Sequence, residues 1–166
     1  MPFEIREERA DDVTAVREVV GRALGPKEAD LVDALRANGA VTLSLVARLD
    51  GQVVGHILYS PIAVCGAIGA ALGPMAVLPE HQRKGIGGRL IEEGRRRLEA
   101  SGCPFVIVLG HDTYYPRFGF VRASAHGITC EWDVPDEAFM VQVLDAAKMA
   151  GVIGMARYRQ EFSAAT

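Results

Sequence analysis

Hydrophobic positions recur along this chain at two spacings, one typical of helices and one typical of strands. Apolar residues repeat every three or four positions over 13–24 and 27–37, which predicts two successive helices. Gly25-Pro26 separates them, because glycine ends a helix and proline suits the first turn of the next one. Before them, Phe3 to Arg6 alternates between apolar and polar residues and predicts a short strand.

The next stretch predicts a hairpin followed by a loop. Residues 43–48 and 52–59 are rich in strand-forming residues, and Asp50-Gly51 between them is a strong turn signal. Pro61 weakens strand pairing at the end of the second run. Residues 62–71 are rich in glycine and alanine, so we expect a loop there before the next strand.

A strand, a long helix and a second strand follow in the centre of the chain. Residues 72–78 are apolar, and Gly73-Pro74 within them predicts a bulge or splay, because proline cannot donate to a β-ladder. Residues 85–100 carry an apolar stripe at helical spacing, and 105–109 form a continuous apolar run typical of a buried strand. This order predicts two parallel, neighbouring strands joined by the helix.

The last third of the chain carries shorter signals. Residues 113–118 predict one or two helical turns, while 120–122 and 128–131 predict short strand pieces. A final strand is expected over 138–144, where apolar residues alternate. The tail, 145–166, mixes glycines with apolar residues, and we expect it to pack back on the domain.

Composition limits the class of protein. The chain has 166 residues, 49% of them hydrophobic, which predicts one globular domain over residues 1–166. A net charge of -3 argues against nucleic acid as a partner, and no run approaches the ~20 apolar residues of a membrane helix. The widely spaced Cys65, Cys103 and Cys130 indicate reduced thiols and no metal site. We therefore expect a cytoplasmic protein without a membrane partner.

A basic, glycine-rich turn stands where the central helix begins. It consists of Gln82, Arg83, Lys84, Gly85, Ile86, Gly87 and Gly88. The first amides of a helix lack partners within it and carry the positive end of its dipole, so such a turn binds anions. The spacing matches neither a P-loop nor a Rossmann glycine fingerprint. The residues alone predict a phosphate- or pyrophosphate-bearing ligand at this turn.

The turn is one part of a longer pattern. The strand, the turn beginning Gln82-Arg83-Lys84-Gly85-Ile86-Gly87, the helix and the second strand are followed by Tyr115, four residues before Gly119-Phe120. This order resembles the GNAT superfamily of N-acetyltransferases, most closely a subgroup of small bacterial predicted acetyltransferases. The resemblance implies an α/β fold with a central mixed sheet of six to seven strands and about four flanking helices. A splayed pair of parallel strands would bind CoA.

The resemblance also implies a reaction and its residues. Acetyl-CoA would donate its acetyl group to a primary amine of an acceptor that the sequence does not specify. The turn residues would hold the CoA pyrophosphate, and the backbone of Met75, Ala76 and Val77 would pair with the pantetheine arm. The amide of Val77 would polarise the thioester carbonyl. Tyr115 matches the family's general acid, and Tyr114 is its rival.

The general base is left open. Members of the family often carry a glutamate on the strand where this chain has Leu72-Gly73-Pro74. His56, His111 and Asp112 are candidates by their expected proximity, and a water molecule is a fourth. His81 is expected on the solvated side of the turn.

Two functions follow from this reading. The first is direct acetyl transfer in a ternary complex, with no cysteine needed as a nucleophile. The second is an acyl-CoA-binding regulatory module without turnover, because no base is evident. Homodimers are common in the family, so a homodimer is a further expectation.

Overall fold

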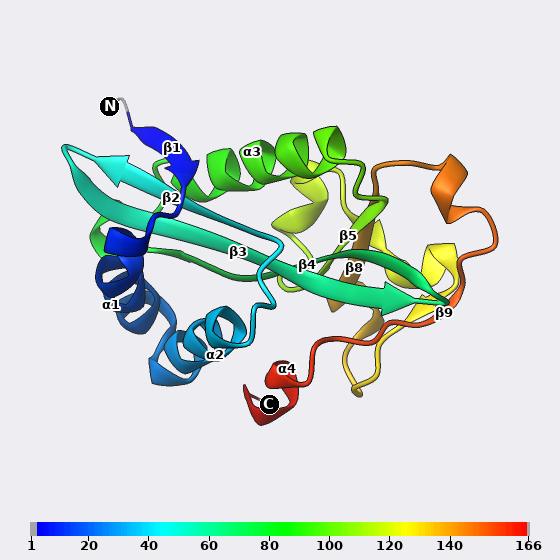
Figure 1. Ribbon diagram of the computed structural model, residues 1–166. Helices are drawn as coiled ribbons and strands as arrows, with labels where there is room; N and C mark the ends of the chain where they lie inside the picture. Colours follow the sequence, from blue (N-terminus) through cyan, green and yellow to red (C-terminus); the bar gives the residue numbers. More distant parts are fainter. Residues whose placement is uncertain (1–2, 166) are drawn as a thin grey trace.

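A seven-stranded sheet runs through the computed structural model, which describes residues 3–165 (Figure 1). Its order is β1-β2-β3-β4-β5-β8-β6. The strands are β1 (Glu4–Glu7), β2 (Leu43–Leu49), β3 (Gln52–Val64), β4 (Ala67–Val77), β5 (Phe105–Leu109), β6 (Val121–Arg122) and β8 (Phe139–Val143). Within the described residues, β4 and β5 are parallel and the other neighbours in this sheet are antiparallel. The predicted mixed sheet and its parallel pair are confirmed.

Helices cover both faces of this sheet. The first two, α1 (Val13–Leu24) and α2 (Pro26–Ala37), lie on one face, and α3 (Ile86–Ala100) lies on the other (Figure 1). The short α4 (Glu161–Ala165) lies beside α2. A second small sheet pairs β7 (Ile128–Thr129) with β9 (Gly154–Met155). No helix within residues 3–165 has the length and apolar character needed to cross a membrane.

The loop expected over residues 62–71 is wrong, because β3 and β4 continue through most of it as one long hairpin. Cys65 and Gly66 form its turn with positive φ angles of 48° and 83°, which suits the twist of paired strands. The small residues reflect close strand contact. A Cβ at Gly69 would lie 2.6 Å from the carbonyl oxygen of Phe105 on β5.

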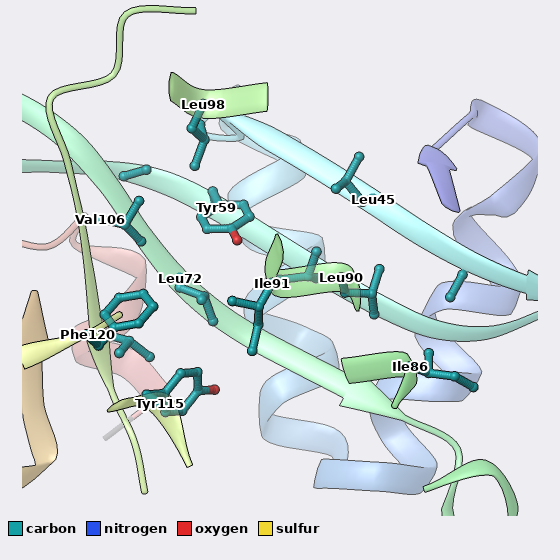
Figure 2. Close-up of a cluster of buried hydrophobic side chains, with 14 of the residues drawn as sticks. Leu45, Tyr59, Leu72, Ile86, Leu90, Ile91, Leu98, Val106, Tyr115 and Phe120 are labelled. Carbon is teal, nitrogen blue, oxygen red and sulfur yellow. The ribbon is translucent and has the colours of Figure 1, made fainter. Parts of the chain in front are cut away.

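The core beneath α3 fixes the position of the helix on the sheet. Ile86, Leu90, Ile91 and Leu98 pack there against strand residues that include Tyr59 and Leu45 (Figure 2). Full burial of each such side chain stabilises the fold by about 1.5–3 kcal/mol. The ring of Tyr59 fits over Gly94, where a Cβ would lie 2.3 Å from its hydroxyl. This packing holds the start of α3 next to the end of β4.

The C-terminal residues return to the rest of the chain. Arg157 and Ala63 exchange backbone hydrogen bonds, so the segment before α4 lies antiparallel beside the end of β3. Glu161 accepts hydrogen bonds from Asn38 Nδ2 at 2.7 Å and from Arg159. These contacts tie α4 to the end of α2.

Candidate functional site

A cleft of about 920 Å³ opens where the ends of α1 and β4 meet the start of α3. The short 3-10 turn η3 (Tyr115–Phe118) and the residue before it close its far side. The cleft is lined by Ala23, Leu24, Met75, Ala76, Val77, His81, Gln82, Arg83, Gly85, Ile86, Gly87, Gly88, Arg89, Glu92, Tyr114, Arg117 and Phe118. It therefore brings together all the residues expected to bind the cofactor except Lys84, which belongs to the same turn.

The parallel strands β4 and β5 separate at the cleft. They pair only from Ala70 to Leu72 on β4, although β4 continues to Val77. The register of β4 against β3 shifts opposite Gly73-Pro74, which confirms the predicted bulge. Beyond Leu72, one edge of β4 therefore has no strand of residues 3–165 beside it.

The pairing with β3 shows which groups face that open edge. The amide of Leu78 donates to the Val54 carbonyl oxygen at 2.9 Å. Along an antiparallel strand the backbone N–H and C=O groups of successive residues point to alternate edges. The N–H and C=O of Ala76, two residues before Leu78, therefore also point toward β3. The N–H groups of Met75 and Val77 consequently face the cleft. Such an edge can bind an extended ligand as an added strand would bind.

The turn before α3 presents backbone amides to the same cleft. Gly85 is the N-cap, with φ of 83°, and no side chain caps the helix within the described residues. The first intrahelical bond runs from the Arg89 amide to the Gly85 carbonyl oxygen, so the preceding amides lack helical partners. Gln82 Nε2 donates to the Val77 carbonyl oxygen at 3.0 Å and thereby ties the turn to the end of β4.

Unpaired cations gather around this turn. The chain has 18 lysines and arginines. In the described part of the chain, those without an ion pair are Arg9, Lys27, Arg83, Lys84, Arg89 and Arg117. Four of them line the cleft or stand in its turn. Together with the helix dipole, they give the cleft a local positive charge in a protein whose net charge is -3, which favours an anionic ligand.

Two adjacent tyrosines occupy different positions relative to the cleft. Tyr114 lines it, and its hydroxyl lies 2.9 Å from the place of a Cβ on Gly87. Tyr115 is 8% exposed and packs edge-on against Phe120, with its hydroxyl directed away from that ring (Figure 2). Burial raises the pKa of Tyr115 to about 12 and also raises the pKa of Tyr114. Both phenols therefore hold their protons at neutral pH.

His56 lies away from the cleft. It is fully buried on the α1–α2 face of the sheet, where its Nε2 is 2.8 Å from Ser44 Oγ. Burial, together with the nearby Arg36 guanidinium, lowers the pKa of His56 to about 3. Glu8 lies 3.6 Å from the ring, but its carboxylate accepts two hydrogen bonds from Arg36. His56 is therefore a buried residue that does not line the cleft.

His111 and Asp112 are exposed in the loop after β5, and neither lines the cleft. The His111 carbonyl oxygen accepts hydrogen bonds from the backbone amides of Tyr114 and Tyr115, so the loop positions η3 through its backbone.

His81, expected on the solvated side, instead lines the cleft and is only partly exposed. Among residues 3–165, no three His, Cys, Asp or Glu side chains are arranged to hold a metal ion.

Sequence reasoning missed several lining residues. They are Ala23 and Leu24 at the end of α1, and Arg89, Glu92, Arg117 and Phe118 on the walls. Only Arg117 and Phe118 had a signal, because they stand between Tyr115 and Gly119-Phe120 of the predicted pattern.

An open strand edge beside an uncapped helix start, with Tyr114 on the cleft wall, is the geometry expected of the class of acyl-CoA-dependent acetyltransferases. Comparisons with known proteins agree. A family model described as an acetyltransferase (GNAT) domain matches residues 41–122. The uncharacterized N-acetyltransferase YjhQ of Escherichia coli (strain K12) is 43% identical over 149 residues, covering 83% of this chain and 82% of YjhQ. The chain therefore belongs to the GNAT family of acetyltransferases.

Solved structures extend the similarity to the whole fold. The GNAT family N-acetyltransferase YhbS from Escherichia coli, in complex with CoA, aligns with a TM-score of 0.93 and 34% identity, covering 97% of this chain and 92% of that chain. A GNAT family acetyltransferase from Brucella melitensis, in complex with acetyl-CoA, aligns with a TM-score of 0.81 and 37% identity, covering 97% and 98%. These two similar proteins bind the cofactor that the sequence pattern predicts.

Proposed function

We propose that the protein transfers the acetyl group of acetyl-CoA to a primary amine by direct attack in a ternary complex. The observation that carries this proposal is the open edge of β4 beside the uncapped start of α3. The amides from Arg83 to Gly88 would bind the pyrophosphate, and Met75 to Val77 would pair with the pantetheine arm. The CoA and acetyl-CoA complexes of the two similar proteins support the same ligand.

The chemistry follows from this placement. The amine nitrogen attacks the thioester carbonyl carbon, and the Val77 N–H donates to the oxygen as negative charge develops. The C–S bond then breaks, the CoA thiolate takes a proton, and the amine loses one. The hydrogen bond from Gln82 to the Val77 carbonyl holds the end of β4 in place during these steps.

Tyr115 is our proposed acid for the thiolate. Its pKa of about 12 keeps it protonated, and its position four residues before Gly119-Phe120 matches the family motif. Tyr114 is the alternative, because it lines the cleft and the buried Tyr115 does not. Of the predicted bases, His56, His111 and Asp112 do not line the cleft, so water is the predicted base that we retain.

The same observation supports a second function. A cleft that holds acetyl-CoA, and that none of the predicted base residues His56, His111 and Asp112 lines, would suit an acyl-CoA-binding regulatory module without turnover. A cytoplasmic location and a homodimer also stay predictions of the sequence resemblance.

Thiol release from acetyl-CoA separates the two functions. The panel of amines would include amino acids, polyamines, aminoglycosides and peptides with free N-termini. Acetyl transfer predicts thiol release that depends on one of these amines. Tight acetyl-CoA binding by calorimetry, with no amine-dependent release across the panel, would favour the regulatory module.

A further inference from the structure

Arg117 is a cation of the cleft that the reaction above does not use. It is exposed on η3, and its guanidinium lies over the rings of Tyr114 and Phe118, at 4.9 and 5.7 Å from their centroids. No carboxylate of the described residues pairs with it. The two rings hold the side chain over the cleft, and its charge is free to meet a ligand.

The place of Arg117 in the cleft suggests which part of a ligand it meets. Phe118 packs against the first turn of α3, where a Cβ on Gly88 would lie 3.0 Å from its ring. The pantetheine arm leaves the pyrophosphate along β4, so the adenosine end must leave in another direction. Gly88, Phe118 and Arg117 all line the cleft, so the adenosine end would run along these residues toward Arg117.

The other charged groups of the cleft are placed differently. Arg83 and Lys84 belong to the pyrophosphate turn itself, and Arg89 lies over the Phe3 ring at 5.4 Å. Glu92 is the carboxylate that lines the cleft, and it pairs with Arg95 at 3.4 Å. Arg117 is therefore the unpaired cation on the η3 wall.

We propose that Arg117 binds the 3′-phosphate of acetyl-CoA, so that the site selects CoA esters over their dephospho forms. The inference rests on the proposed function for the identity of the ligand. A guanidinium matches phosphate oxygens with two parallel hydrogen bonds, and a side chain already ordered by two rings loses less entropy on binding. Dephospho-CoA keeps the pyrophosphate and the pantetheine arm and lacks only the group that Arg117 would contact.

Calorimetric titration of CoA and dephospho-CoA tests the proposal on the whole protein and on three variants, Arg117→Gln, Arg117→Lys and Arg122→Gln. In Arg117→Gln the cation is removed. Arg122→Gln is the matched control. Arg122 is an exposed arginine outside the cleft, and it pairs with Asp136 at 3.3 Å. Wild type and Arg122→Gln should bind CoA about 5- to 10-fold more tightly than dephospho-CoA.

Arg117→Gln should bind both ligands with the wild-type affinity for dephospho-CoA, and Arg117→Lys should keep part of the preference. Because the contact is exposed, the preference should also shrink as salt rises. Equal loss of both affinities in Arg117→Gln, or an unchanged preference, would overturn the role of Arg117 and leave the proposed function standing. Failure of the wild type to bind either ligand would overturn both.

Discussion

Burial sets the protonation of the two tyrosines and gives each a different prediction. Tyr115→Phe removes the proposed acid while the ring and its packing on Phe120 remain. We expect turnover to fall by about 100-fold or more, with acetyl-CoA affinity nearly unchanged. Tyr114→Phe is the matched control and should retain most activity. Steady-state kinetics with calorimetry on both variants measures the difference.

The pH profile adds an independent check on Tyr115. A phenol with a pKa of about 12 is the protonated donor at every pH below that value. Deprotonation of Tyr115 should therefore cause no fall in activity up to about pH 10.

The two tyrosine variants also distinguish the candidate acids. A wild-type rate in Tyr115→Phe, with a loss of activity in Tyr114→Phe, would transfer the acid role to Tyr114.

His56 makes a prediction about stability instead of catalysis. Its pKa is about 3 in the folded protein and about 6.5 when unfolded. Between these values the unfolded state binds the extra proton, so the stability present above about pH 6.5 is lost as pH falls toward 3. His56→Gln removes this titration. Its melting temperature should fall less than that of wild type between pH 7 and pH 4.5.

Thermal unfolding of both proteins at the two pH values decides the matter. An equal decrease would show that other groups control the acid sensitivity. Unchanged CoA affinity in His56→Gln would agree with its place outside the cleft.

At the scale of elements, the packing of α3 on the sheet depends on Gly94, because the ring of Tyr59 on β3 occupies the space of a Cβ there. Gly94→Ala would push a Cβ into the Tyr59 ring, with a contact of 2.3 Å to the hydroxyl before relaxation. We expect a loss of about 1–3 kcal/mol in the free energy of unfolding. Gly21→Ala on α1 is the control, because nothing lies within 4 Å of its Cβ. That change should stabilise by about 0.5–1 kcal/mol.

Chemical denaturation of the two variants measures both signs. Equal stabilisation by the two alanines would show that α3 does not need the close approach of Tyr59. A parallel loss of CoA affinity in Gly94→Ala would show that the packing of α3 also positions its amino-terminal turn.

Periodicity predicted α1, α2 and α3 well because each buries one apolar stripe. Composition was misleading over residues 62–71, where the many glycines and alanines predict a loop. There the small side chains let β4 lie close to Phe105, a contact between residues distant in sequence. Local composition cannot distinguish a flexible loop from strands that pack closely.

At the scale of the whole molecule, charge is distributed unevenly. Most arginines pair with carboxylates on the surface, whereas four of the six unpaired cations in the described part of the chain lie at the cleft. This distribution explains how a protein with a net charge of -3 can hold a polyanionic ligand.

The site could be predicted only in part, because some of its residues are distant in sequence and meet only in the folded chain. The turn from Gln82 to Gly88 is continuous in sequence, so its anion-binding character was evident. Leu24 joins the cleft only because α1 ends next to β4 in space. Likewise, side-chain alternation along β3 predicts which strand residues share a face with His56. It does not predict that α1 and α2 cover this face, because that depends on tertiary packing.

The central claim is that the turn before α3 holds the CoA pyrophosphate, and one binding measurement tests it most directly. Gly85 and Gly66 both have φ of 83° with nothing within 4 Å of a Cβ. Gly85→Glu and Gly66→Glu therefore add the same charge and strain, one in the turn and one at the hairpin tip. Calorimetry should show wild-type CoA affinity for Gly66→Glu and a loss of roughly 100-fold or more for Gly85→Glu. Wild-type affinity in Gly85→Glu would contradict the account.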